Sequence, residues 1–168
     1  MSTPTKRIAF HTMGCKLNFS ETSAISRDFL KYGFIAVDYQ DIADIYVLNS
    51  CSVTNNADKE ARKLIRRAKR RNPLSTMVVT GCYAQLKPQE VSSIEGVDMV
   101  VGSKEKFDLI KYLDNVDLKS DLKILTSDIN SIEEFIPSYS CDDRTRSFLK
   151  IQDGCNYNCS FCTIPLAR

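Results

Sequence analysis

Short apolar runs alternate with segments of helical character from residue 8 to residue 113, and this alternation constrains the fold most. We expect strands at Ile8–Met13, Phe34–Val37, Ile45–Leu48, Met77–Thr80 and Val97–Val101. We expect helices at Asn18–Lys31, Asn56–Arg71, Pro88–Ile94 and Phe107–Leu113. Strands that alternate with helices form βαβ units, whose strands run parallel. The sequence therefore predicts an α/β fold with an open parallel sheet.

The regular pattern ends after this region. Residues 114 to 143 are irregular and rich in acidic and serine residues, so we predict a domain at 1–115 and a linker at 116–143. A new strand is expected at Arg146–Gln152, leading into a cysteine loop, and residues 144–168 would open a second domain. The chain stops six residues after its last cysteine. We expect it to contain only the start of that domain and not to turn over alone.

Seven cysteines in 168 residues require an explanation. The N-terminus carries no recognisable signal peptide, and no run reaches the about 18–20 apolar residues that cross a bilayer. We therefore expect a cytoplasmic protein without membrane contact, in a compartment that keeps thiols reduced. Metal binding or catalysis then explains the cysteines better than disulfide bonds do. The net charge of +2 does not by itself indicate a nucleic-acid partner.

The C-terminal cysteines are Cys155, Cys159 and Cys162, at spacings of four and three residues. Three thiolates can bind one face of a cubane cluster, which leaves a fourth iron open for a substrate or cofactor, as in catalytic metal sites. The alternative is zinc, which requires a fourth protein ligand. His11 is distant in sequence, and Cys141 lies fourteen residues before Cys155, which is not a usual zinc spacing.

Cys15, Cys51 and Cys82 are dispersed, but each follows an expected strand. The carboxyl ends of parallel strands form one edge of a sheet, where ligands bind. Gly14 and Gly81 directly precede two of these cysteines and suit a close approach of backbone to a bulky cluster. We therefore predict a second three-cysteine cluster at this edge. The alternative is that they are small buried core residues.

The expected helix at Asn56–Arg71 is unusually basic. Between Lys59 and Arg71 it carries eight Lys or Arg residues against the single acid Glu60. It can bind RNA phosphates, or it can simply be a solvated helix face. The candidate RNA-binding residues are Arg62, Lys63, Arg66, Arg67, Lys69 and Arg70.

Four motifs, in this order, resemble the methylthiotransferase family of radical S-adenosylmethionine enzymes. They are His11–Asn18, Asn49–Thr54, Thr80–Gln85 and Gln152–Pro165. The resemblance implies a Rossmann- or flavodoxin-like first domain with one 4Fe–4S cluster, on Cys15, Cys51 and Cys82. It implies a second 4Fe–4S cluster on Cys155, Cys159 and Cys162, at the start of a partial (β/α) barrel. That cluster would bind S-adenosylmethionine, with Phe161 beside the adenine.

The resemblance also implies a reaction and its partners. Family members replace a C–H bond with a methylthio group, using a 5′-deoxyadenosyl radical and a reductant such as flavodoxin or ferredoxin. Lys16-Leu17-Asn18 after the first cysteine is similar to the branch that acts on N6-threonylcarbamoyladenosine at position 37 of tRNA. The other branches act on N6-isopentenyladenosine or on a ribosomal-protein aspartate. A zinc-stabilised RNA-binding module is the alternative from another class. A flavodoxin-like fold does not imply the function of a flavodoxin-like binding domain. Such a domain needs a phosphate-binding glycine loop after its first strand, whereas here Gly14 is followed by Cys15 and Lys16.

Overall fold

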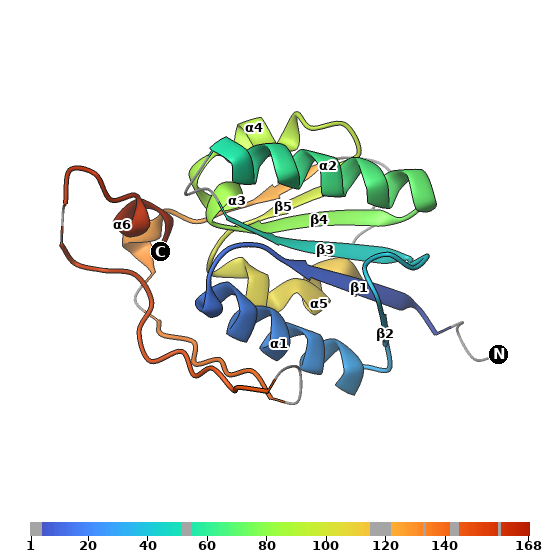
Figure 1. The fold of residues 1–168 in the computed structure, drawn as a ribbon, viewed down its shortest axis with the longest axis horizontal. Helices are drawn as coiled ribbons and strands as arrows, with labels where there is room; N and C mark the ends of the chain where they lie inside the picture. Colours follow the sequence, from blue (N-terminus) through green and yellow to red (C-terminus); the bar gives the residue numbers. More distant parts are fainter. Residues whose placement is uncertain (1–4, 52–54, 115–121, 133, 142–144, 158) are drawn as a thin grey trace.

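The computed structural model describes residues 5–51, 55–114, 122–132, 134–141, 145–157 and 159–168. Six parallel strands form one open sheet in the order β2-β1-β3-β4-β5-β6 (Figure 1). They are β1 (Arg7–Thr12), β2 (Ile35–Val37), β3 (Ile45–Ser50), β4 (Thr76–Gly81), β5 (Met99–Val101) and β6 (Lys123–Leu125). The predicted α/β fold and its five expected strands are confirmed.

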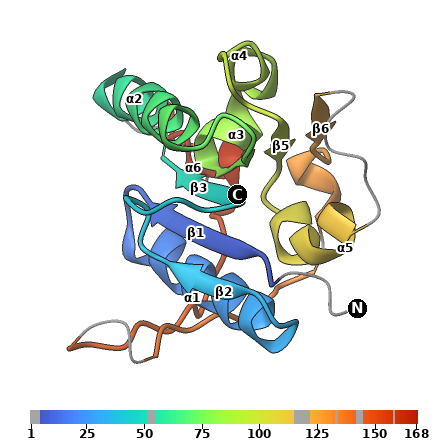
Figure 2. The ribbon, with the colours of Figure 1, turned by 90° about the vertical axis from the view of Figure 1, so that its right-hand side faces the viewer.

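Helices cover both faces of the sheet (Figure 2). The elements on one face are α2 (Asn55–Arg71), α3 (Cys82–Leu86) and α4 (Pro88–Ser92), and on the other α1 (Lys16–Lys31), the 3-10 turn η1 (Glu105–Asp108) and α5 (Leu109–Asp114). The chain continues through η2 (Ile129–Ser131) to α6 (Ile164–Ala167). The expected helices are confirmed with small shifts of their ends, and α3 was not expected. No described helix is long and apolar enough to span a membrane.

The core consists of two layers that meet at the central strands. All six residues of β3 are buried, as is typical of a parallel strand covered on both faces. Tyr46 and Leu48 of this strand pack in the cluster under α2, whereas Ile45 and Val47 pack in the cluster under α1 and α5. The strand period of two thus divides one apolar run between both faces of the sheet.

Two segments of the second half differ from the expectation. Lys123–Leu125 lies in the predicted linker, yet it is strand β6, where Ile124 pairs with Val100 of β5. Its three residues are too short to produce a periodic pattern. Parts of that linker, residues 116–121, 133, 142 and 143, lie outside the described residues, as do residues 52–54 of the second motif.

The predicted strand at Arg146–Gln152 is wrong. Leu149 forms only an isolated antiparallel bridge with Tyr139. The Ser140 amide donates to the Phe148 carbonyl at 2.9 Å, and the Lys150 amide to the Ser138 carbonyl at 2.8 Å. A strand requires a neighbour, and within the described ranges the segment around Ser138–Ser140 is what pairs with this one. Leu149 and Ile151 of this segment face solvent and are 68% and 82% exposed, whereas Phe148 packs against Phe19.

Candidate metal centre at the carboxyl edge of the sheet

The fold brings three distant cysteines to one edge of the sheet. Cys51 directly follows β3, Cys82 directly follows β4, and Cys15 lies three residues beyond the end of β1. These three strands are adjacent, and Thr12 is in register with Asn49 at the carboxyl end. The strand order reverses between β1 and β3, which is where open α/β sheets bind ligands. The strand-edge prediction for these cysteines agrees with this placement.

Two glycines make close approach possible at this edge. Gly14 has a φ of 87°, and a Cβ added there would lie 2.7 Å from Cys51 Cβ and 2.8 Å from Cys51 Sγ. The loop that carries Cys15 therefore packs directly against Cys51. Gly81 has a φ of 90°, and a Cβ there would overlap the Ser50 carbonyl oxygen. Side chains are excluded from both turns, because they would displace Cys51 at one and the backbone of Ser50 at the other.

The three thiols differ in environment. Cys15 is exposed, Cys51 is half-buried and Cys82 is buried. Burial raises the pKa of the Cys82 thiol, while the charge and hydrogen bond of the Arg168 guanidinium act in the opposite direction. Within the described ranges, no set of three His, Cys, Asp or Glu side chains is arranged to hold one metal ion. The thiols therefore share an edge without converging on one point.

The residues at this edge suit an iron–sulfur cluster. Thiolates are the ordinary ligands of such clusters. The Thr80 hydroxyl, two residues before Cys82, is buried and has no hydrogen-bond partner among the described residues. A buried O–H without an acceptor suits an electron-rich sulfur group bound above it, since unsatisfied buried donors are otherwise rare.

Asn18 links the loops that carry Cys15 and Cys51. Its side-chain amide donates to the Met13 carbonyl at 2.9 Å and to the Ser50 carbonyl at 3.1 Å. Asn18 is buried on the first turn of α1, so the start of this helix ties the ends of β1 and β3 together. The sequence marks Asn18 only as part of a motif, and its short distance from Cys15 was the available signal for this role.

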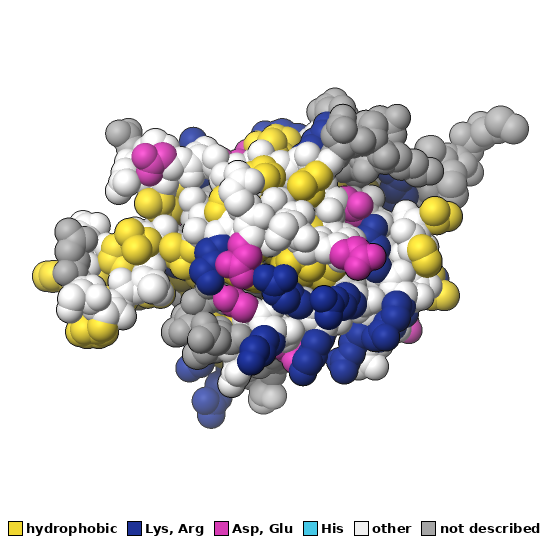
Figure 3. All heavy atoms as spheres, turned by 90° about the horizontal axis from the view of Figure 1, so that it is seen from above, with side chains coloured by type: hydrophobic (Ala, Val, Ile, Leu, Met, Phe, Trp, Pro, Cys, Tyr) yellow, Lys and Arg dark blue, Asp and Glu magenta, His cyan; other side chains and the backbone are white. Residues whose placement is uncertain are grey.

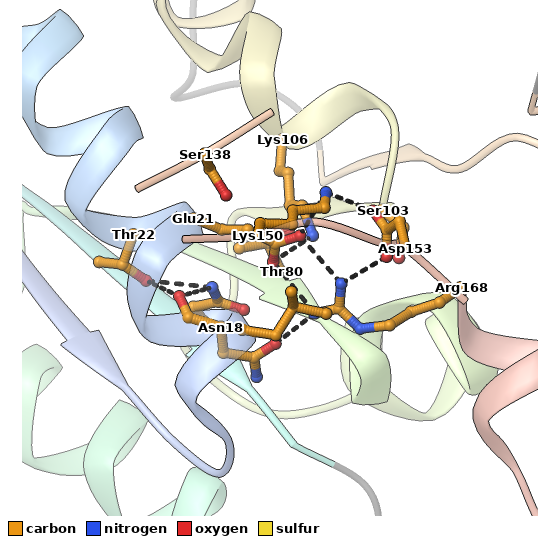
Figure 4. Close-up of polar contacts among 12 residues, drawn as sticks. Asn18, Glu21, Thr22, Thr80, Ser103, Lys106, Ser138, Lys150, Asp153 and Arg168 are labelled. Carbon is orange, nitrogen blue, oxygen red and sulfur yellow. Dashed lines mark hydrogen bonds and ion pairs between the residues drawn. The ribbon is translucent and has the colours of Figure 1, made fainter. Parts of the chain in front are cut away.

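A buried ionic cluster lies beside the cysteine edge (Figure 4). We call it the Glu21 cluster. It comprises Glu21, Lys106, Lys150, Asp153 and Arg168. Burial opposes ionisation of Glu21, but the charges of the three cations and the Arg168 hydrogen bond outweigh it and hold its pKa well below the usual range. No sequence signal pointed to this cluster, since Glu21 and Arg168 are 147 positions apart.

The C-terminal segment that leads into α6 lies at the same end of the molecule, beyond the carboxyl ends of the strands (Figure 1). Cys155 and Cys162 are half-buried and Cys159 is exposed. The Cys162 amide donates to the Cys159 carbonyl at 3.0 Å. A cavity of about 520 Å³ adjoins Cys155. Phe161, the predicted neighbour of the adenine, is 89% exposed.

The basic face of α2 is clearly visible at the surface (Figure 3). Lys63, Arg66, Arg67 and Arg70 are exposed. Lys63 pairs with Glu60 at 3.6 Å, whereas no carboxylate of the described residues lies within ion-pair distance of Arg66, Arg67 or Arg70.

Two other candidates on α2 have partners inside the protein. Arg62 pairs with Glu90 at 2.8 Å. Lys69 pairs with Asp98 at 2.7 Å. Both are partly buried, so the basic surface is narrower than the sequence suggests.

Known proteins match the region of the sheet and most of the rest of this chain. The model of the family described as "Uncharacterized protein family UPF0004" matches residues 7–102. The chain is 44% identical over 165 residues to the threonylcarbamoyladenosine tRNA methylthiotransferase MtaB of Bacillus subtilis, covering 96% of this chain and 36% of the relative. The MtaB of Aquifex aeolicus is 40% identical over 164 residues, covering 96% of this chain and 40% of the relative.

One relative with another name is less similar to this chain. The tRNA-2-methylthio-N(6)-dimethylallyladenosine synthase of Clostridium novyi is 31% identical over 170 residues, which covers 97% of this chain and 37% of the relative. The chain thus spans well under half of the length of the curated relatives it matches. On a match that covers strands β1 to β5 and all three strand-end cysteines, the chain belongs to the UPF0004 family.

Proposed function

We propose that this chain is the cluster-bearing part of a tRNA methylthiotransferase. Its reaction would insert a methylthio group at C2 of N6-threonylcarbamoyladenosine at position 37. The observation that carries the proposal is the meeting of Cys15, Cys51 and Cys82 at one sheet edge. The names of the relatives at 44% and 40% identity support this substrate. The activity, the substrate and the partners belong to the longer protein.

The two cysteine sets would hold two 4Fe–4S clusters. Cys15, Cys51 and Cys82 would ligate the first, and Cys155, Cys159 and Cys162 the second. When bound, the clusters and S-adenosylmethionine would supply the radical chemistry and the sulfur transfer. Three protein ligands leave one iron of each cluster open, and the open iron of the second would take the cofactor. The exposed ring of Phe161 is available to cover the adenine.

The chain's own residues would position these groups. Asn18 would hold the Cys15 loop against the end of β3 through its bonds to Met13 and Ser50. The buried Thr80 hydroxyl, which has no partner among the described residues, would be available to donate to a sulfur atom of the first cluster.

The exposed part of the α2 face, which contains Arg66, Arg67 and Arg70, would contact tRNA phosphates. A reductant such as flavodoxin or ferredoxin would supply electrons, and the enzyme would be cytoplasmic without membrane contact. The sequence-based candidates Arg62 and Lys69 would contribute less to binding, because both already pair with carboxylates.

Iron and sulfide analysis tests the cluster assignment. The chain is reconstituted anaerobically beside a variant in which Cys15, Cys51 and Cys82 are all alanine. We expect the unmodified chain to hold about four more irons per molecule, because one cubane cluster is lost in the variant. Equal iron in both samples would contradict the first cluster. Uptake of zinc in place of iron would favour the alternative, a zinc-stabilised RNA-binding module.

Binding of tRNA at several salt concentrations tests the basic face. The change is Arg66→Gln, Arg67→Gln and Arg70→Gln together in the full-length protein. We expect weaker binding and a slope of log affinity against log salt that falls by about 0.7–0.9 for each phosphate that the variant no longer neutralises. Arg62→Gln, on the same helix but paired with Glu90, is the matched control. An unchanged slope in the triple variant would show that α2 is merely a solvated face.

Substrate analysis of the full-length enzyme separates the methylthiotransferase branches. The assay offers tRNA that carries threonylcarbamoyladenosine, tRNA that carries isopentenyladenosine, and the ribosomal-protein substrate. We expect methylthiolation of the first alone. A methylthio product on either of the other two would assign the chain to that branch instead.

A further inference from the structure

The residues that flank the C-terminal cysteine segment contact one buried carboxylate, that of Glu21. Glu21 is 0% exposed and projects from α1. Its Oε1 accepts hydrogen bonds from Lys150 Nζ at 3.0 Å and from Arg168 Nη1 at 2.9 Å. Lys150 lies five residues before Cys155, and Arg168 lies six residues after Cys162. The segment that carries this cysteine triad is thus a loop whose two ends meet at Glu21 (Figure 4).

The base of this loop is closed by further contacts. Asp153 forms ion pairs with Lys150 and, at 2.8 Å, with Arg168. Gly154 has a φ of 74°, and a Cβ there would lie 2.5 Å from the Arg168 carbonyl oxygen. The two ends of the loop therefore contact each other as well as Glu21.

Arg168 also contacts Asn18, the residue that links the loops of Cys15 and Cys51. Its Nη2 donates to Asn18 Oδ1 at 2.5 Å and to Glu21 Oε2 at 3.0 Å. Asn18 in turn donates to the Met13 and Ser50 carbonyls, which flank the Cys15 and Cys51 positions. A continuous series of hydrogen bonds therefore connects the base of the second cysteine loop to the sheet edge that carries the first.

The sheet domain contributes its own cation to the cluster. Lys106, which is 0% exposed, donates to Glu21 Oε2 at 2.7 Å. A buried ion pair is weak evidence for stability, because its desolvation offsets its attraction. Its hydrogen bonds are directional, however, and they favour one arrangement of the groups that they join. A role in geometry explains the Glu21 cluster better than a role in stability.

We infer that Glu21 and Arg168 are positioning residues that fix the Cys155–Cys162 loop against the edge that carries Cys15, Cys51 and Cys82. The pair sets the spacing between the two cysteine triads. The docking stands on the contacts described above, and only its meaning for catalysis rests on the proposed function.

Hydrogen exchange of the full-length protein without clusters tests the docking. The variant is Arg168→Gln, which removes the guanidinium and leaves the core of the sheet intact. We expect amides of residues 145–168 to exchange at least about tenfold faster, because the base of the loop opens locally. Glu21→Gln should have the same effect. If Glu21→Gln fails to fold because Lys106 has lost its carboxylate partner, the result for Arg168→Gln alone tests the docking. Unchanged exchange in Arg168→Gln would overturn the inference.

The control variant is Asp28→Asn, also on α1. Asp28 pairs with Lys31 at 2.9 Å, and both side chains are exposed. Pairs of this kind contribute little to stability. Exchange of residues 145–168 should therefore remain unchanged in this variant. An equal acceleration in the control would mean that any change on α1 loosens the loop, which would overturn the specific role of Glu21.

Pulsed EPR of the reconstituted full-length protein tests the spacing itself. The readout is the spin–spin interaction between the two reduced clusters, with iron content as a check. We expect Arg168→Gln to keep its iron but to broaden or weaken this interaction, and Arg168→Lys to restore it in part. An interaction unchanged in Arg168→Gln would overturn the spacing role. If the unmodified protein takes up no iron, the proposed function fails, while the exchange experiment still decides the docking.

Discussion

Replacement of Gly14 by alanine should damage the cysteine edge more than it damages the fold. At a φ of 87° an L-residue costs about 1–2 kcal/mol of unfolding free energy. The added Cβ would also lie 2.7 Å from Cys51 Cβ and 2.8 Å from Cys51 Sγ, which real Cβ contacts do not allow. Overpacking of this kind costs about 1–3 kcal/mol more. Either Cys51 or the loop of Cys15 must move, and each movement displaces a predicted ligand.

Gly33→Ala provides a matched control. Gly33 has nearly the same φ, 85°, but nothing lies within 4 Å of an added Cβ. It therefore isolates the backbone cost of about 1–2 kcal/mol. The sum for Gly14→Ala is about 2–5 kcal/mol. At about 2–4 °C per kcal/mol, the expected fall in Tm is roughly 4–20 °C for Gly14→Ala and roughly 2–8 °C for Gly33→Ala.

The assay combines thermal unfolding of the metal-free chain, followed by circular dichroism, with iron content after anaerobic reconstitution. We expect Gly33→Ala to retain its iron and Gly14→Ala to lose most of the iron bound by the first cysteine triad. The reasoning would be refuted by equal falls in Tm together with equal iron contents. That result would mean that Gly14 and Cys51 are not in contact.

Three further outcomes are expected. The folded-state pKa of Glu21 is lowered, so its contribution to stability is present above the unfolded pKa of about 4.3 and is lost as pH falls below it. The free energy of unfolding, measured with urea, should therefore fall less steeply as the pH drops below about 4 in Glu21→Gln than in the unmodified chain. Ile65→Ala, on the buried face of α2, should cost about 2–5 kcal/mol of unfolding free energy, measured by urea titration. Lys69→Met removes the pair with Asp98 and should cost about 1–3 kcal/mol by the same measurement, whereas tRNA affinity should change little.

The strands, the helices and the cysteine edge could be predicted because their signals are local. The apolar run of β3 is buried on both faces, so it is visible in the sequence without its neighbours. Cys51 and Cys82 follow their strands without a gap, and a parallel sheet places strand ends together. The order β2-β1-β3-β4 then made the three cysteine-bearing strands adjacent, which the sequence did not specify.

Short segments and segments that lie outside the sheet could not be predicted. β6 has three residues, too few for a period, and belongs to the sheet only because β5 pairs with it. The alternation at Arg146–Gln152 resembled a strand, but a strand depends on a partner, and the segment instead bridges to Tyr139. In both cases pairing between distant parts of the chain decided the outcome.

By itself, the sequence determined the parallel α/β architecture and the positions of Cys51 and Cys82 directly after strands, since hydrophobic period and the end of a strand are properties of neighbouring residues. Tertiary structure alone decided that Arg62 and Lys69 would be paired internally, and that Glu21 would receive Lys106, Lys150 and Arg168. A carboxylate in a helix reads as a solvated side chain. It can be buried only when cations from distant segments compensate for its desolvation, and a local sequence pattern does not show which distant residues will contact it.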